Sequence, residues 1–297
     1  MKFIFTFNQG RMQLGKARFP FLFLAAVLVV AHCAAGQDTY FVTYSQQMEE
    51  PGNLEIGLKA VAGSPSGGNT FIGNALEFEY GAKAWWTSEL YFDGQSTANE
   101  STVFTGFRWE NRFRPLLAEH WINPVLYLEF ENVNSADKSL LEVVGHDGRA
   151  EFIERNDRNR RKREAELKLI LSSNVRGWNF SENIIAEKNL GNEPWEFGYA
   201  LGASRPLAMK AAAIPCVLCR ENFSAGAEMY GGLGERHSLG LHDTSHYVAS
   251  IVQWRMPSGT TFKVSPGFGL NDKSHGFLFR VGASYELNQI ASRLRGH

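Results

Sequence analysis

The stretch VFTGFRWENRF, residues 103–113, alternates apolar with small or charged side chains over a length that few soluble strands reach. One set is Val103, Thr105, Phe107, Trp109 and Phe113, and the other is Gly106, Arg108, Glu110 and Arg112. A period of two places the two sets on opposite faces of an extended chain. The stretch therefore predicts a β-strand with one apolar face and one strongly charged face.

The same pattern recurs along the chain, with turn residues between the segments. It is found within residues 54–61, 76–81, 86–93, 126–131, 164–171, 195–202, 225–230, 247–255, 262–268 and 277–286. A twelfth segment, residues 178–188, leaves two interpretations open, because Glu182 breaks the alternation if Ile184 and Ala186 face outward. This segment holds either a bulge or a different phase. We expect about twelve strands in one domain.

Two features favour a membrane barrel over a soluble β-sandwich, which also alternates. The alternation often runs for about 9–11 residues, the length that a tilted strand needs to cross a bilayer. Short links at 81–84, 174–177 and 257–259 join even strands to odd ones, whereas long links at 63–71, 94–101, 133–161 and 234–246 mostly follow odd strands. Bacterial barrels have short periplasmic turns and longer outer loops. The expected fold class is all-β, an antiparallel transmembrane β-barrel with both termini in the periplasm.

The N-terminus has the pattern of an export signal. Four basic residues precede an apolar run over residues 19–31, and small residues follow at Ala34, Ala35 and Gly36. We expect residues 1–36 to be a cleaved signal peptide; the alternative is an uncleaved anchor helix, for which about 13 apolar residues are too few. A periplasmic N-terminal segment (37–52), the barrel (53–287) and a C-terminal tail (288–297) are expected to follow.

With this signal peptide, these strands and pieces such as Ser181-Glu182-Asn183 and Gly231-Gly232-Leu233-Gly234, the chain resembles the porin-like or transporter-like outer-membrane barrels of Gram-negative bacteria. The resemblance implies residence in the bacterial outer membrane, contact with its lipid and insertion by the barrel-assembly machinery. It also implies passage of small polar solutes, and it names no particular substrate. A closed structural or surface-binding barrel and a secreted soluble all-β binding protein are the alternatives.

Charged side chains of such strands must face the lumen, because an Arg or Lys facing lipid at mid-bilayer costs about 2–4 kcal/mol. Strand phase assigns these acids to the lumen: Glu55, Glu77, Glu79, Glu89, Asp93, Glu110, Glu129, Glu131, Glu164, Glu166, Glu196, Glu228 and Glu286. It assigns these bases: Lys59, Arg108, Arg112, Lys168, Arg255, Lys263 and Arg280. They form either a hydrated pore or an ion-paired plug, because a barrel of about twelve strands lies between filled small barrels and open large ones.

The remaining motifs indicate little chemistry. Cys216 and Cys219 form a C-x-x-C pair, which we expect to be a disulfide in an oxidising compartment. His237, His242 and His246 share one outer loop and are weak candidates for binding a transition metal. No G-x-S-x-G motif occurs, so we expect no catalytic residues and no cofactor. The near balance of 30 basic and 31 acidic side chains predicts no nucleic-acid partner.

Overall fold

A computed structural model gives the architecture of the 297-residue chain. It describes residues 38–64, 69–134, 144, 161–214 and 216–290, all of which belong to one compact unit. The expected signal peptide, most of the 133–163 loop and residues 291–297 of the expected tail lie outside the described residues. Within those residues, no helix has the length and apolar character that a membrane span requires.

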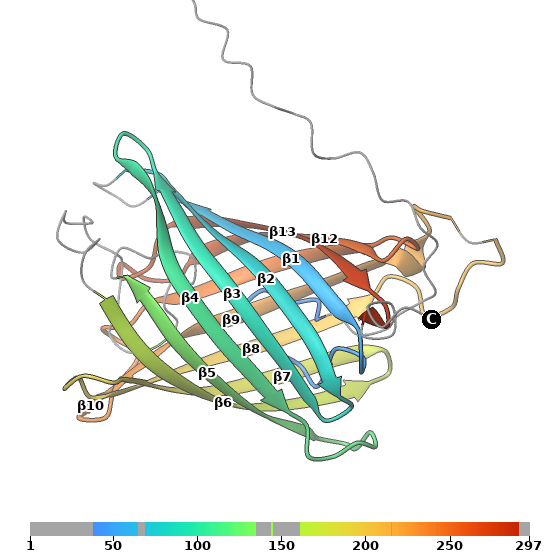
Figure 1. Cartoon of the computed structure of the whole chain (residues 1–297), viewed down its shortest axis with the longest axis horizontal. Helices are drawn as coiled ribbons and strands as arrows, with labels where there is room; N and C mark the ends of the chain where they lie inside the picture. Colours follow the sequence, from blue (N-terminus) through green and yellow to red (C-terminus); the bar gives the residue numbers. More distant parts are fainter. Residues whose placement is uncertain (1–37, 65–68, 135–143, 145–160, 215, 291–297) are drawn as a thin grey trace, which may run out of the picture. The chain divides into compact units, whose positions relative to one another are not determined.

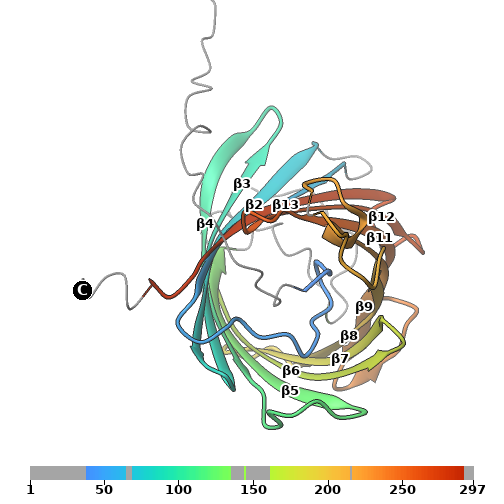
Figure 2. The ribbon, with the colours of Figure 1, turned by 90° about the vertical axis from the view of Figure 1, so that its right-hand side faces the viewer.

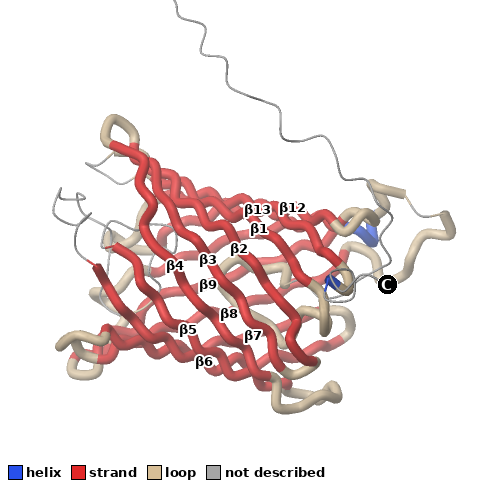
Figure 3. The backbone as a smooth tube through the Cα atoms, in the orientation of Figure 1, coloured by secondary structure: helices blue, strands red, loops and turns tan. Residues whose placement is uncertain are grey.

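The described chain is built almost entirely from strands that follow one another through short turns or loops (Figures 1 and 3). The strands are β1 (Leu54–Gly63), β2 (Phe71–Lys83), β3 (Trp86–Thr97), β4 (Ser101–Phe113), β5 (Asn123–Asn134), β6 (Arg161–Val175), β7 (Trp178–Asn189), β8 (Trp195–Pro206), β9 (Phe223–Glu235), β10 (Ser238–Leu239), β11 (His246–Arg255), β12 (Thr260–Gly269) and β13 (Phe277–Leu287). A 3-10 turn, η2 (Arg220–Asn222), precedes β9.

Twelve of these strands close into an antiparallel barrel, as the alternation predicted. Each long strand pairs with its neighbours, β8 pairs with β9, and β13 returns to β1 with Leu287 opposite Leu54. The two-residue β10 pairs only with β9, in the connection to β11, and is not part of the wall. We call the end with the β2–β3, β6–β7 and β11–β12 turns the turn end, and the opposite end the loop end. The start of β1 and the end of β13 both lie at the turn end.

The outer face of the barrel is apolar, as a membrane requires. Side chains such as Leu76, Leu128, Leu169, Val252 and Phe279 are exposed on it. Aromatic rings gather at the turn end, where Trp85, Trp86 and Phe113 stack on one side and Phe223 stacks on Trp254 on another. Aromatic girdles mark the interface between membrane and water in such barrels. The barrel is therefore of the outer-membrane type.

The β3–β4 hairpin differs from the sequence prediction in two ways. The expected long link at 94–101 is a turn of only three residues, because both strands continue to Thr97 and from Ser101 (Figure 1). The expected outward phase of Thr105 is also wrong. The register shifts beside Gly94, so that Thr105 is fully buried and Phe104 is exposed. A β-bulge inserts one residue and reverses the alternation beyond it, which a fixed period of two cannot anticipate.

Strand β7, whose phase was open, alternates without interruption over Trp178–Asn189. Ser181, Asn183, Ile185 and Glu187 are buried on its inner face. Glu182 is exposed on the outer face, between strands that pair with it at Leu171 and Leu201. The strand therefore contains no bulge within its described pairing, and the departure is a single carboxylate on the apolar face.

The segment before β1, expected to be periplasmic, instead crosses the lumen (Figure 2). Tyr40, Thr43, Ser45, Gln46, Met48 and Glu49 are all buried there. We call residues 38–49 the inserted segment. Its sequence does not alternate, and within the segment the side chains of Asp38 and Ser45 bond each other and nearby backbone N–H groups. The lumen wall supplies the other hydrogen-bond partners. The physical reason for the difference is thus a set of long-range contacts that local sequence does not encode.

Candidate functional site: the charged lumen

The lumen contains the charged residues that strand phase assigned to it. Thirteen of them are buried: Glu55, Glu77, Glu89, Asp93, Arg108, Glu110, Arg112, Glu129, Glu131, Glu164, Glu166, Glu228 and Arg280. Seven more at the same strand phase are half-buried: Lys59, Glu79, Lys168, Glu196, Arg255, Lys263 and Glu286. Their contacts decide between the two interpretations, pore or ion-paired plug.

Among the described residues, Arg112 is the centre of the largest ion-pair cluster. Its guanidinium contacts the carboxylates of Glu79 and Glu89 through Nη2, and that of Glu110 at 3.1 Å through Nε. These three acids come from β2, β3 and β4, and the register places them directly opposite one another. Like charges in that arrangement repel one another, so the arginine is what allows these carboxylates to be buried side by side.

The other ion pairs also join residues of the same or adjacent strands. Arg108 on β4 pairs with Asp93 on β3 at 2.9 Å and with Glu129 on β5 at 3.1 Å. Elsewhere, the Lys59 ammonium lies 2.8 Å from Glu77, and that of Lys168 lies 2.7 Å from Glu166. These pairs therefore run along the wall and do not bridge the bore.

The inserted segment makes the contacts that do cross the bore. The backbone N–H groups of Val42 and Thr43 each donate to Glu228 Oε2 at 3.0 Å. Asn183 accepts from the Tyr44 N–H at 2.7 Å and donates to the Tyr44 carbonyl at 2.9 Å. The Tyr44 hydroxyl donates to Glu110 on the far side at 2.9 Å. The Glu228 carboxylate is thus a lumen charge that also binds the backbone of the segment.

Two further wall groups fit the segment. The Tyr40 hydroxyl donates to the Asn179 side chain at 2.9 Å, and Gly202 lies beneath the same ring. A Cβ at Gly202 would come within 2.6 Å of a Tyr40 ring atom, so only glycine leaves this space. At the root of the segment, burial and the nearby Glu286 and Glu55 carboxylates raise the pKa of Glu49 to about 8.

Cavities lined by described residues remain in the lumen beside the inserted segment, and two of them bear on its function. The larger cavity has a volume of about 110 Å³ and is lined by wall residues of β1, β5 and β6, including Lys59, Glu131 and Lys168. The smaller cavity, of about 40 Å³, lies against Glu55, Glu79 and Lys263. Phe41 and Tyr44 line both, so the segment forms part of the wall of each. Polar cavities of these sizes have room for water.

The weak metal candidates are not brought together. His246 is buried and bonds the Tyr199 hydroxyl at 3.0 Å and the Thr244 hydroxyl at 2.8 Å, while His242 is exposed. Among the described residues, the carboxylates of Glu77, Glu79 and Glu89 are the group close enough to share an ion, within 4.8 Å of one another. Arg112 and Lys59 already pair with these acids, so we assign no metal to them.

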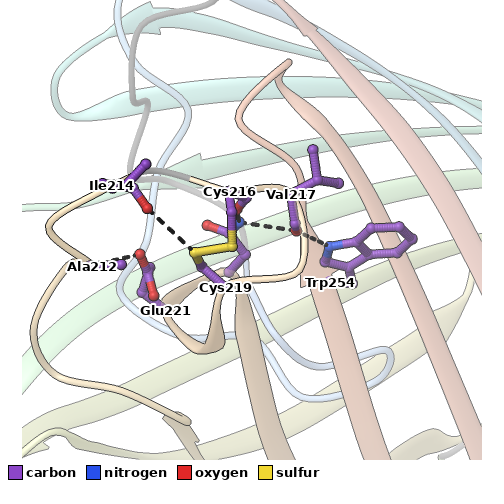
Figure 4. The surroundings of a disulfide bond; sticks show 8 residues. Ala212, Ile214, Cys216, Val217, Cys219, Glu221 and Trp254 are labelled. Carbon is purple, nitrogen blue, oxygen red and sulfur yellow. Dashed lines mark hydrogen bonds between the residues drawn. A yellow bond between two sulfur atoms is a disulfide. The ribbon is translucent and has the colours of Figure 1, made fainter.

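Cys216 and Cys219 are joined by a disulfide, in the long connection between β8 and β9 at the turn end (Figure 4). Cys216 and the neighbouring Val217 are exposed, whereas Cys219 is half-buried. The Val217 carbonyl accepts a hydrogen bond from the Trp254 indole at 3.0 Å. The bond therefore shapes an external loop and lies apart from the lumen groups.

Sequence reasoning missed the lumen residues that bind the inserted segment. Asn179 and Asn183 lie on β7, where the phase was open, and their amides were not considered. An inward phase for Ser181, Asn183 and Glu187 was available from their even spacing. The contact of Asn183 with Tyr44, which is 139 positions away in the sequence, left no local signal.

No protein-family model matches the chain, and no curated protein sequence matches it significantly. In fold it is similar to the COG4313 outer membrane channel from Pseudomonas putida F1, with a TM-score of 0.51 and 10% identity over 80% of this chain and 97% of that one. A KdgM porin in complex with disordered oligogalacturonate has a TM-score of 0.46 and 8% identity, over 78% of this chain and 98% of that one. The NanC porin has a TM-score of 0.45 and 11% identity, over 79% of this chain and 100% of that one. At these identities the likeness concerns the fold alone.

Proposed function

We propose that the protein is an outer-membrane channel for small polar solutes whose bore is closed in this structure by the inserted segment. The observation that carries this proposal is the direction of the ion pairs. Arg112, Arg108, Lys59 and Lys168 pair with carboxylates on their own or nearby strands, so these four bases have counter-ions in the wall and do not bridge the bore. A charged wall of this kind favours polar over apolar solutes.

The closing element is of a kind that can move. Residues 38–49 precede β1, so one side of the segment is tethered only through residues 50–53. Its contacts with the wall are hydrogen bonds, which in water contribute about 1 kcal/mol each, together with packing of Val42, Tyr44 and Met48 against buried wall residues. Water entering the bore would replace those bonds, whereas the backbone hydrogen bonds between the strands of the barrel would remain. We assign no catalytic step to this lumen.

Single-channel recording in planar bilayers tests the proposal. We expect the full chain to conduct rarely, and a variant that lacks residues 38–48 to conduct steadily, because the deletion removes the contacts across the bore. Migration of unboiled and boiled samples in detergent gels is the control that both proteins are folded barrels. A folded deletion variant that stays silent would show that the wall itself closes the bore, and a structural or surface-binding barrel would then be the better account.

A further inference from the structure

The register of the barrel aligns ten glutamates into one continuous ladder. Each is the direct cross-strand partner of the next, on ten successive strands of the wall. In order around the barrel they are Glu286, Glu55, Glu79, Glu89, Glu110, Glu129, Glu166, Glu187, Glu196 and Glu235. Directly opposed like charges destabilise a sheet, so this arrangement is unfavourable for folding alone.

The ladder climbs from one end of the barrel to the other. Antiparallel hydrogen bonds run perpendicular to the strands, and barrel strands tilt by about 35–45° from the axis. A line through directly paired residues must therefore advance along the bore. Glu55 is the second residue of β1 at the turn end, and Glu235 is the last residue of β9 at the loop end. The carboxylates thus form a ramp between the two mouths.

The larger cavity lies along the middle of this ramp. Five glutamates line it: Glu129, Glu131, Glu164, Glu166 and Glu187. Of the basic groups around it, Lys59 pairs with Glu77, Arg108 with Asp93 and Glu129, and Lys168 with Glu166. Arg280 donates to the Tyr230 hydroxyl. Each of these bases thus has at least one partner in the wall.

Glu131 is different from the other acids in the cavity. Its side chain is 5% exposed, next to the ladder on β5, and within the described residues it makes no hydrogen bond or ion pair. Arg108, its direct cross-strand partner on β4, attracts this carboxylate but bonds Asp93 and Glu129 instead. A buried carboxylate without a hydrogen bond of its own is costly. A cation entering the cavity would remove that cost, so this group is an independent indication of a cationic ligand.

The cavity also shows how an alkylammonium group is held there. The Lys168 ammonium lies 4.1 Å from the centre of the Tyr127 ring and 4.9 Å from that of Tyr44, with Glu166 as its counter-ion. Carboxylate and aromatic faces together are the groups that recognise ammonium ions. Tyr91 adds a third ring to the same cavity.

We propose that the larger cavity binds a primary alkylammonium ion through Glu131, as a station on an acidic path formed by the glutamate ladder. The path deepens the proposed channel function and rests on it, whereas binding in the cavity does not require conduction. One feature favours the opposite charge: Nη2 of Arg280, in the same cavity, has no hydrogen-bond acceptor in the part of the chain that the structure describes. An anion held by that group is the competing ligand.

Calorimetric titration of the full chain in detergent with 1,4-diaminobutane tests the binding. We expect Glu131→Gln to weaken it roughly tenfold or more, since a hydrogen bond to a charged group is lost. The matched control is Glu182→Gln, which removes the same charge from the outer face and should change the affinity less than about twofold. Glu131→Asp keeps the carboxylate and should bind with intermediate strength. Gel migration shows that each variant is folded.

The outcomes separate this inference from the channel proposal. Binding that is lost in Glu131→Gln and kept in Glu182→Gln supports the site, even if no variant conducts. Absent binding, binding indifferent to Glu131, or equal competition by potassium chloride overturns it. Binding of acetate that depends on Arg280 would overturn it in favour of an anion. In the variant without residues 38–48, a reversal potential that shows selectivity for chloride over potassium would overturn the acidic path. The channel proposal would not be affected.

Discussion

Two parts of the lumen wall bury polar groups in different ways. On β1–β6, Lys59, Arg108, Arg112 and Lys168 pair with carboxylates of the wall itself; we call these residues and their partners the paired wall. On β7–β9, Asn179, Asn183, Gly202 and Glu228 bind the inserted segment; we call these four the docking wall. The ion pairs of the paired wall form within the wall, although Glu110 and Arg112 also bond Tyr44 and Gln47 of the segment. The docking wall is complete only with the segment in place.

This difference separates stability from gating. Losing a partner within the paired wall leaves a buried charge in a barrel that cannot rearrange, so the cost falls on folding. Losing a partner within the docking wall weakens the binding of the inserted segment, and water can take over the hydrogen bonds that are lost. The cost therefore falls on closure. The variants below test this division, beginning with the one expected to have the largest effect.

Arg112→Ala should destabilise the barrel most. It leaves the carboxylates of Glu79, Glu89 and Glu110 adjacent without their shared cation. Removing one partner of a buried ion pair costs about 3–5 kcal/mol. Urea unfolding in lipid vesicles, followed by gel migration, should show a correspondingly lower midpoint. Arg114→Ala is the control, because Arg114 is half-buried and bonds only loop carbonyls of Leu116 and Leu117. Equal midpoints for the two variants would contradict a structural role for the pairs.

Closure should weaken as the pH rises from about 5 to about 8. Glu49 has a pKa of about 8 when docked, against about 4.3 when exposed to water. The docked state therefore holds a proton that the released state gives up, so docking is strongest at low pH and loses up to about 1.4 kcal/mol per pH unit within this window. Above about 8 both states are ionised and no further change is expected.

Channel open probability between pH 5 and 9 measures this dependence. The groups that face Glu49 include Glu55 and Glu286, which repel its ionised form, and Asn53, which does not titrate. Glu49→Gln should keep the segment docked across the range and flatten the profile. A profile that stays steep in this variant would assign the dependence to the other carboxylates.

Asn183→Ala should open the channel without destabilising the barrel. It removes both hydrogen bonds to the Tyr44 backbone. Two such bonds contribute about 1–3 kcal/mol, a roughly five-fold to hundred-fold change in the ratio of closed to open channel. Asn111→Ala is the control, because the Asn111 side chain accepts from the Trp86 indole on the outer side of β4. If unfolding midpoints fall and open probability does not change, the docking wall is structural.

The sequence predicted the paired wall well and the docking wall poorly, for a physical reason. Lipid excludes charge from the outer face, so the phase of each strand reveals its lumen acids and bases without any knowledge of its partners. Arg108 and Arg112 could be placed inside on that ground alone. Neutral amides such as Asn183 indicate the lumen face less clearly, because placing an uncharged amide on the lipid face costs less free energy than placing a charge there.

Register is the other quantity that a single sequence withholds. The alternation places Glu129 and Glu166 on inner faces, and only the register of the β5–β6 pairing makes them direct partners. The glutamate ladder was therefore invisible before the structure, although eight of its ten members had been assigned to the lumen. Thr105 shows the same limit locally, because its bulge depends on how β3 pairs with β4.

Gly202→Ala should have the smallest effect on closure. Its new Cβ would approach the Tyr40 ring to 2.6 Å, so the ring must shift by a small distance to accommodate it. The close contacts are all with side-chain atoms, of the Tyr40 ring and of the Thr43 methyl group. The cost is therefore at the low end for overpacking, about 1 kcal/mol, or roughly five-fold in the closed-to-open ratio. Gly267→Ala on β12 is the matched control, because a Cβ there meets nothing closer than 3.5 Å. Because both variants add one methyl group to a buried glycine, a general loss of strand quality would raise open probability equally in the two. An increase confined to Gly202→Ala, abolished when residues 38–48 are also deleted, would place the effect at the contact with Tyr40.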